Sequence, residues 1–131
     1  MTEDSTVARA AILPSSSLTV RLRQAEAELR DLLLPLLAEH GLSAEHWRII
    51  AVVAEYPGLT MTGVAGSAIV PAATLTRHVD KLVERGLVVR HVDPDDKRRV
   101  VLALSPAGDA YARRLLAAEQ SSAAAAAVLV S

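Results

Sequence analysis

The segment 93–99 concentrates charge in a form that suits contact with a polyanion. It reads Asp93-Pro94-Asp95-Asp96-Lys97-Arg98-Arg99 and ends in three consecutive cations. Runs rich in β-branched residues flank it over 87–92 and 100–104, and two such runs joined by a Pro/Asp turn predict a β-hairpin. Cations at the tip of a thin hairpin can reach into the minor groove of duplex DNA, where the negative potential is strong.

A second set of polar residues falls on a helix that we predict over 71–85. Leu75, Val79 and Leu82 recur at helical spacing and mark its inward face. The polar residues outside that face or on its flanks are Thr74, Thr76, Arg77 and Lys81. Arg77 suits bidentate contact with guanine, and the alternative is an ion pair with Asp80, three residues on. The threonines are expected to contact the DNA backbone, with plain surface filling as their alternative.

The elements that would position these two sets form a recognisable order. A short helix over 62–68 precedes the helix over 71–85, and the hairpin follows. A further helix begins after Ser43 and buries Trp47, and 59–61 can add a short strand beside the hairpin. This order predicts a mainly α fold with a small β-hairpin, a winged helix-turn-helix over about 43–105.

Apolar helices are predicted on both sides of this module. Leucines recur at helical spacing over 18–40, and Ser105-Pro106 starts a helix that runs over 106–130. Nothing else in the chain is left to cover them, so we expect them to be dimerisation helices that pair with a second copy. Residues 1–17 are expected to be a flexible N-terminal arm, and 18–131 a single domain.

Four short motifs appear in order across the second half of the chain. They are Thr74-Leu75-Thr76-Arg77-His78-Val79-Asp80-Lys81-Leu82, Glu84-Arg85-Gly86-Leu87-Val88, Asp93-Pro94-x-Asp96-x-Arg98 and Leu104-Ser105-Pro106-x-Gly108. Upstream, Gly41-Leu42-Ser43 is followed by Trp47. Taken together, the chain resembles the multiple-antibiotic-resistance regulator (MarR) family of transcription factors over about residues 18–118.

The resemblance implies a function and roles for particular residues. It implies a ligand-responsive repressor that binds a pseudo-palindromic operator as a homodimer, with two recognition helices about one DNA turn apart. It implies that Arg98 enters the minor groove and that Asp96 orients it, where the alternative is a surface salt bridge worth under about 1 kcal/mol. Lys97 and Arg99 would add attraction to phosphates. A small organic effector would bind near Trp47 and Tyr111, for which a purely structural role in the core is the alternative.

The chain departs from the family pattern in the helix-turn-helix itself. Gly63 and Gly66 fall in the first helix, Ile69 replaces the turn glycine, Pro71 replaces a serine, and Ala73 replaces a polar residue that could read bases. These changes support an alternative function, a degenerate winged-helix module for protein interaction and dimerisation that binds DNA weakly.

The charge distribution is compatible with DNA binding although the formal net charge is −1. Residues 71–105 hold seven Lys/Arg against five Asp/Glu, whereas residues 1–70 hold five against eight. The cations are therefore concentrated where the motif needs them. The acidic N-terminus lacks the basic start of a secretory signal, and no apolar run is long enough to span a membrane, which predicts a cytoplasmic protein without a membrane partner.

The composition also limits the chemistry. There is no cysteine, which excludes disulfides and a thiol switch. His40, His46, His78 and His91 show no ligand spacing typical of a metal site, so neither a metal nor another cofactor is expected. No nucleophile–base pair or phosphate loop is present, so the sequence does not predict an enzyme.

Overall fold

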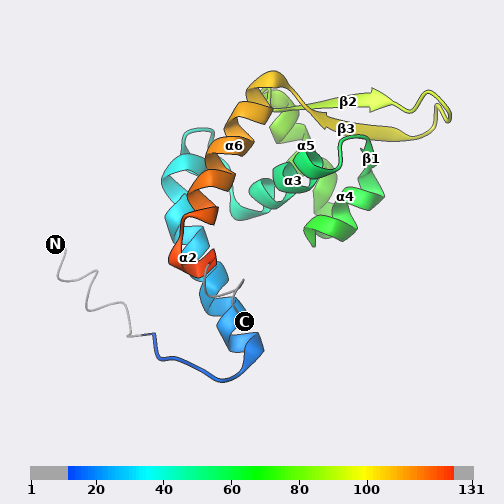
Figure 1. Cartoon of the computed structure of the whole chain (residues 1–131). Coiled ribbons are helices and arrows are strands. Elements are labelled where there is room, and N and C mark those ends of the chain that lie inside the picture. The colour runs from blue at the N-terminus through cyan, green and yellow to red at the C-terminus, as the bar shows by residue number, and fades with distance from the viewer. Residues whose placement is uncertain (1–11, 126–131) are drawn as a thin grey trace.

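The computed structural model describes residues 12–125 and consists mainly of helices with one small sheet (Figure 1). The elements, in chain order, are α2 (Leu18–Ala38), α3 (Ala44–Glu55), β1 (Leu59–Thr60), α4 (Met61–Ala68), α5 (Ala72–Glu84), β2 (Val88–Val92), β3 (Val100–Leu104) and α6 (Pro106–Gln120). The fold class predicted from the sequence is confirmed. Residues 1–11 of the arm predicted over 1–17 lie outside the described residues, as do residues 126–131. The C-terminal helix predicted over 106–130 ends earlier, because α6 stops at Gln120 and Ser121 is its C-cap.

Short polar side chains fix the starts of several helices. The Ser17 hydroxyl accepts a hydrogen bond from the Val20 N–H, and the Ser105 hydroxyl accepts one from the Gly108 N–H at 2.9 Å. Thr60 does the same for α4 through the Gly63 N–H. Each bond satisfies a backbone donor that the helix leaves free at its N-terminus.

The sheet is antiparallel, with strand order β1-β3-β2. β2 and β3 form the predicted hairpin, with Val88 opposite Leu104 and Val92 opposite Val100. The short strand β1 pairs with the other edge of β3. The hairpin extends well beyond the helices in Figure 1, so its tip is free to approach another molecule.

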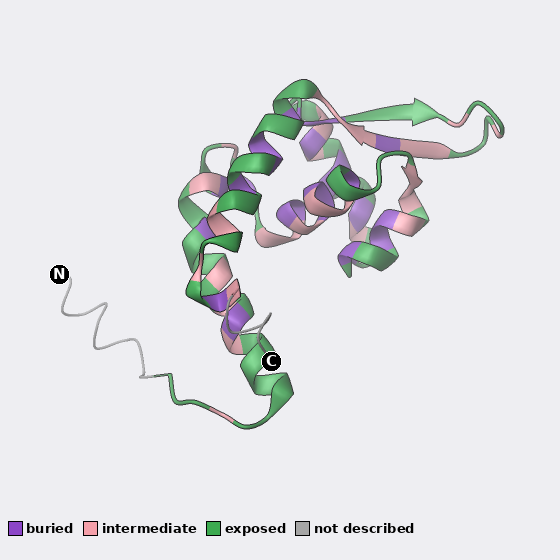
Figure 2. Cartoon of the chain, in the orientation of Figure 1, coloured by how far each residue is buried: buried purple, intermediate pink, exposed green. Residues whose placement is uncertain are grey.

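One hydrophobic core joins the elements of the winged module to α2 and α6. Its largest fully buried side chains are Leu37, Ile49, Ile50, Leu82, Leu87, Leu102 and Leu115. Figure 2 shows that burial concentrates where α3, α4, α5 and α6 meet. Helix α5 therefore presents one face to the core and keeps the opposite face exposed.

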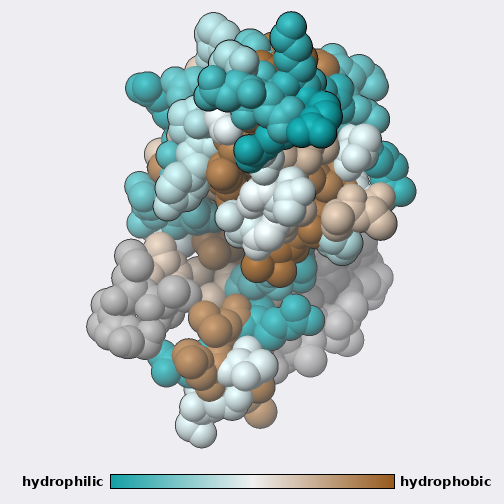
Figure 3. Space-filling model, turned by 90° about the vertical axis from the view of Figure 1, so that its right-hand side faces the viewer, coloured by the Kyte–Doolittle hydropathy of each residue, from teal (hydrophilic) through white to brown (hydrophobic). Residues whose placement is uncertain are grey.

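Apolar side chains remain exposed on α2 and α6. On these two helices the large ones are Leu18, Val20, Leu22, Leu32, Leu34 and Leu116. Figure 3 shows hydrophilic surface over the wing at the top and apolar surface near the lower end, where α2 begins. Within the described residues, no helix is long and apolar enough to cross a membrane.

Candidate nucleic-acid interface

The exposed face of α5 carries two of the four polar residues that the sequence predicted for it. Thr76 and Arg77 are exposed, and Leu75, Val79 and Leu82 are buried beneath them. Thr74 is half-buried, and its hydroxyl donates a hydrogen bond to the Pro71 carbonyl at 3.1 Å. Thr74 therefore helps to close the first turn of the helix.

The ion pair between Arg77 and Asp80, considered above as the alternative role of Arg77, does not form. Asp80 instead pairs with Arg90 on β2. This pair links the recognition helix to the first strand of the wing. Within the described part of the chain Arg77 makes no ion pair, so its guanidinium is available at the surface.

Lys81 is engaged within the chain. Its ammonium group donates a hydrogen bond to the carbonyl of Gly41, forty residues away in sequence. The bond ties the C-terminal half of α5 to the loop between α2 and α3. The sequence placed Lys81 facing outward, but it is half-buried, and its predicted contact with DNA stays a prediction.

The tip of the wing is held by its own aspartates. The Asp93 N–H donates to the Arg99 carbonyl, and the Arg99 N–H donates to the Asp96 carbonyl, each at 2.9 Å. The Asp96 carboxylate accepts bonds from the backbone N–H of Arg98 at 3.0 Å and from its Nε at 3.2 Å. These two bonds, the backbone one first, lower the pKa of Asp96.

The cations of the tip face solvent. The Arg98 side chain is 91% exposed, and Lys97 and Arg99 are also exposed. Because Asp96 accepts bonds from both the backbone N–H and the Nε of Arg98, the guanidinium is held at a defined position on the tip. This geometry is compatible with the roles that the family resemblance implied for Asp96 and Arg98.

A buried histidine pair that was not predicted from the sequence joins α3 to α5. The Ser43 N–H donates to Nδ1 of His46 at 2.9 Å, so Nδ1 is an acceptor and the proton of the neutral ring lies on Nε2. That Nε2 lies 3.1 Å from Nδ1 of His78, which must then accept. The remaining nitrogen of His78 faces Glu45 at 3.6 Å.

The histidine pair has electrostatic consequences. Burial, followed by the charges of His78 and Lys81, lowers the pKa of His46 to about 4. His46 is therefore neutral at physiological pH, and the hydrogen-bond chain is satisfied in one tautomeric arrangement. Within the described residues, no group of three or more His, Asp or Glu side chains could hold a metal ion. A capping-box position three residues after Ser43 was the one sequence signal for His46.

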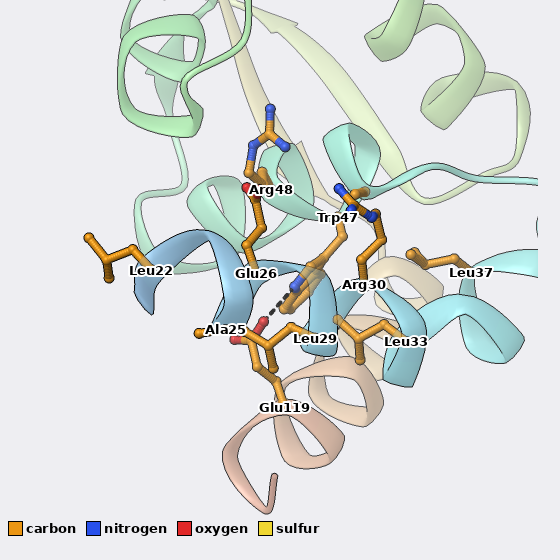
Figure 4. Close-up of a pocket in the computed structure, with 11 residues that line it drawn as sticks. Leu22, Ala25, Glu26, Leu29, Arg30, Leu33, Leu37, Trp47, Arg48 and Glu119 are labelled. Carbon is orange, nitrogen blue, oxygen red and sulfur yellow. Dashed lines mark hydrogen bonds between the residues drawn. The ribbon is translucent and has the colours of Figure 1, made fainter. Parts of the chain in front are cut away.

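An apolar pocket of about 220 Å³ lies between α2, α3 and α6 (Figure 4). Its walls include Leu22, Leu29, Leu33 and Trp47, with Glu26, Arg30, Arg48 and Glu119 as its charged residues. The Trp47 indole N–H donates to the Glu119 carboxylate at 3.0 Å. Of the two residues predicted to bind an effector, the structure brings Trp47 to this wall.

Tyr111 lies in the core and does not line this pocket. Its hydroxyl donates to the Leu36 carbonyl at 2.6 Å, and its ring makes an edge contact with His40. Burial, with the Glu39 charge as a second cause, raises its pKa. Tyr111 therefore ties α6 to the end of α2.

Comparisons with known proteins agree with this geometry. Residues 40–99 match the model of the MarR family. Over 98 residues the chain is 30% identical to the homoprotocatechuate degradative operon repressor of Escherichia coli, covering 75% of this chain and 66% of the repressor. The chain belongs to the MarR family. The resemblance stated from the sequence is thereby confirmed.

Two further proteins are similar to this chain. The HTH-type transcriptional regulator FarR of Neisseria gonorrhoeae is 33% identical over 94 residues, 72% of this chain and 64% of that regulator. The structure of NadR in complex with 4-hydroxyphenylacetate superposes with a TM-score of 0.74 at 26% identity, covering 94% of this chain and 87% of NadR. The matches to both curated relatives span just under two thirds of their lengths.

Proposed function

We propose that this MarR-family chain is a DNA-binding transcriptional regulator, a repressor that binds a pseudo-palindromic operator as a homodimer. The observation that carries the proposal is the wing, where Asp96 holds the exposed Arg98 at the tip of a projecting hairpin. The exposed face of α5, with Thr76 and Arg77, supplies the major-groove surface. We assign the protein to the cytoplasm and give it no catalytic role.

The residues that line the apolar pocket favour an effector with both an apolar and an anionic part. Its walls are leucines and Trp47, and Arg30 and Arg48 lie at its edge. An aromatic ring would pack against the apolar walls, and a carboxylate would be attracted to the two guanidinium groups. We therefore propose a small aromatic acid as the ligand, in keeping with the 4-hydroxyphenylacetate complex of NadR.

A salt titration of DNA binding tests the proposal. Labelled genomic fragments would be titrated with the wild type and with Arg98→Ala at several salt concentrations. We expect affinity to fall with salt and the slope for Arg98→Ala to shrink by about one unit per subunit. Arg113→Ala is the matched control, because it removes an exposed cation from α6, away from the wing. Equal slopes for all three proteins would contradict the assignment of the wing.

The second candidate function is a protein-interaction module with weak DNA binding. It is favoured by Ile69 and Ala73, which stand where the family has a turn glycine and a polar residue that could read bases. Binding that is weak and equal on all genomic fragments, from a protein that remains dimeric, would support this candidate over the repressor.

A further inference from the structure

The turn between α4 and α5 contains a strained residue. Ile69 has φ 55° and ψ 55°, which is the left-handed conformation, and within the described residues no other non-glycine residue has a positive φ. This conformation is unfavourable for residues with a Cβ, and most of all for β-branched ones. Because Ile69 is 77% exposed, packing of its own side chain gives little compensation. Contacts from elsewhere must stabilise the turn.

Arg48 of α3 supplies those contacts. Its Nε donates to the Ala68 carbonyl at 2.9 Å, and its Nη2 donates to the Ile69 carbonyl at 3.0 Å. These are the carbonyls at the C-terminus of α4, where a cation is also favoured by the helix dipole. One planar guanidinium therefore donates hydrogen bonds to two successive carbonyls of the strained turn.

The position of this turn sets the direction of α5. The N–H groups of Ile69 and Val70 both donate to the Ala65 carbonyl, and these bonds close the C-terminus of α4. Pro71 follows as the N-cap residue of α5. A change of backbone angles at Ile69 would rotate α5 relative to α4. The two bonds from Arg48 thus act on the orientation of the recognition helix, although Arg48 lies twenty residues upstream of Ala68.

Arg48 also lines the apolar pocket. Figure 4 draws its side chain among the lining residues, which also include Glu26, Arg30 and Trp47. Arg48 therefore lines the space for a ligand, and its guanidinium holds the turn. An anion in the pocket would compete with the two carbonyls for its N–H groups.

We infer that Arg48 is a positioning residue that takes over the role of the missing turn glycine. It holds Ile69 in the left-handed conformation and thereby fixes the orientation of α5 for DNA binding. An organic anion that binds in the pocket would alter the turn through Arg48. The inference rests on the proposed function for its effect on DNA, but its structural part can be tested without DNA.

Amide hydrogen exchange of the full chain tests the structural part. In Arg48→Ala we expect the Val70 amide to exchange about tenfold faster than in the wild type, while amides in the middle of α6 are unchanged. Adding Ile69→Gly should restore most of the protection, because glycine adopts the left-handed conformation without the penalty. Equal protection of Val70 in the wild type and Arg48→Ala would overturn the inference.

Two variants keep the test decisive if Arg48→Ala does not fold. Arg48→Lys keeps the charge but cannot place two N–H groups in the planar fork, so Val70 should exchange at an intermediate rate. Arg113→Ala is the matched control, since it removes an exposed cation of α6 that does not line the pocket. Val70 exchange in Arg48→Lys that equals the wild type, or faster exchange in Arg113→Ala, would contradict the role given to Arg48.

DNA titrations test the functional part. We expect Arg48→Ala to bind DNA about tenfold more weakly than the wild type. Arg48→Ala with Ile69→Gly should recover the affinity, and Arg113→Ala should bind as the wild type does. Failure of the wild type to bind DNA at any salt concentration would overturn the proposed function. Val70 exchange would then still show whether Arg48 stabilises the turn at Ile69. Wild-type binding with no loss in Arg48→Ala would overturn the inference alone.

Occupancy of the pocket can be followed with Trp47, the single tryptophan of the chain. 4-Hydroxyphenylacetate and benzoate would be added while Trp47 fluorescence and Val70 exchange are measured. We expect a ligand that changes the fluorescence to speed Val70 exchange in the wild type and to do so less in Ile69→Gly. A fluorescence change with unaltered exchange would overturn the link between pocket and turn. No fluorescence change with either acid would contradict both the aromatic-acid ligand of the proposed function and the link between the pocket and the turn. Val70 exchange in Arg48→Ala would still show whether Arg48 stabilises the turn.

Discussion

At the residue scale, the interface depends on polar side chains whose partners lie either close to them or far from them in the sequence. Asp96 and Arg98 are two residues apart, so the arrangement at the wing tip is local. His46 and His78 are 32 residues apart, and their contact exists because α3 packs on α5. The first pair places a cation on the surface, and the second fixes the helix that carries Arg77.

The histidine pair predicts a pH dependence of stability. The pKa of His46 is about 4 in the folded chain and about 6.5 when unfolded. The unfolded state therefore binds more protons between these values, and the free energy of unfolding should fall as the pH drops from about 6.5 toward 4. Protonation of His46 would also break the bond from the Ser43 N–H.

Thermal unfolding between pH 7.5 and 4.5 checks this expectation. The wild type should lose more stability than His46→Gln, by up to about 3 kcal/mol at the acidic end. His91→Gln is the control, because His91 is exposed on the wing. If the wild type and His46→Gln lose stability in parallel, the pair does not control the pH response.

Arg77 is the side chain whose role in specificity a substitution can define. If it reads a guanine, Arg77→Ala should cost about 1–3 kcal/mol on the operator and less on random duplex. If it contacts only phosphate, both losses should be equal, and specificity would then come from DNA shape. Pro71 and Ala73 favour the phosphate contact. Titrations against both duplexes distinguish the two, and unchanged binding on both would remove Arg77 from the interface.

At the scale of elements, the glycines that depart from the family pattern have different surroundings. A Cβ on Gly66 of α4 would meet no atom within 4 Å, whereas a Cβ on Gly63 would lie 3.0 Å from the flexible end of Leu59. By contrast, a Cβ on Gly108 of α6 would lie 1.9 Å from the Leu87 carbonyl oxygen. The start of α6 thus packs directly against the backbone before β2.

Alanine at Gly66 and alanine at Gly108 are expected to have opposite effects on the free energy of unfolding. Gly66→Ala should raise the free energy of unfolding by about 0.5–1 kcal/mol, because alanine has the higher helix propensity and meets no obstacle. Gly108→Ala should lower it by about 1–3 kcal/mol, since the backbone must move apart. Denaturant unfolding of both variants measures this. A Gly108→Ala protein as stable as the wild type would contradict the close contact.

At the scale of the whole molecule, the winged module has a complete core, but α2 and α6 expose large apolar side chains. Leu18, Leu22 and Leu34 on α2 and Leu116 on α6 are each more than 40% exposed. Patches of this kind are typical of surfaces that pack against another protein. A second copy of the chain, packed on α2 and α6, would place two wings and two α5 helices on one DNA duplex.

A charge introduced into this surface should dissociate the proposed dimer. Leu116→Glu would bury a carboxylate against apolar side chains if α6 lies in the interface, so it should shift the chain to monomer at micromolar concentration. Val92→Glu is the matched control, because Val92 is an exposed apolar residue on the wing, outside the proposed interface. Sedimentation velocity measures both. A wild type that sediments as a monomer would contradict the homodimer itself.

The sequence by itself determined the elements and the wing, because their signals are local. Helical spacing of Leu75, Val79 and Leu82 predicts α5, Ser105-Pro106 predicts the start of α6, and the Pro/Asp turn predicts the hairpin with its cations. Each of these depends on residues a few positions apart, whose backbone preferences and periodicity act before any tertiary contact forms.

The tertiary structure alone decided which side chains meet across elements. Lys81 bonds to Gly41, Asp80 pairs with Arg90 rather than with Arg77, and Arg48 holds the turn at Ile69. No periodicity or motif encodes these partners, because they are set by how the helices pack after hydrophobic burial. That packing also lets a β-branched residue occupy the left-handed turn, since two hydrogen bonds from another helix offset its strain.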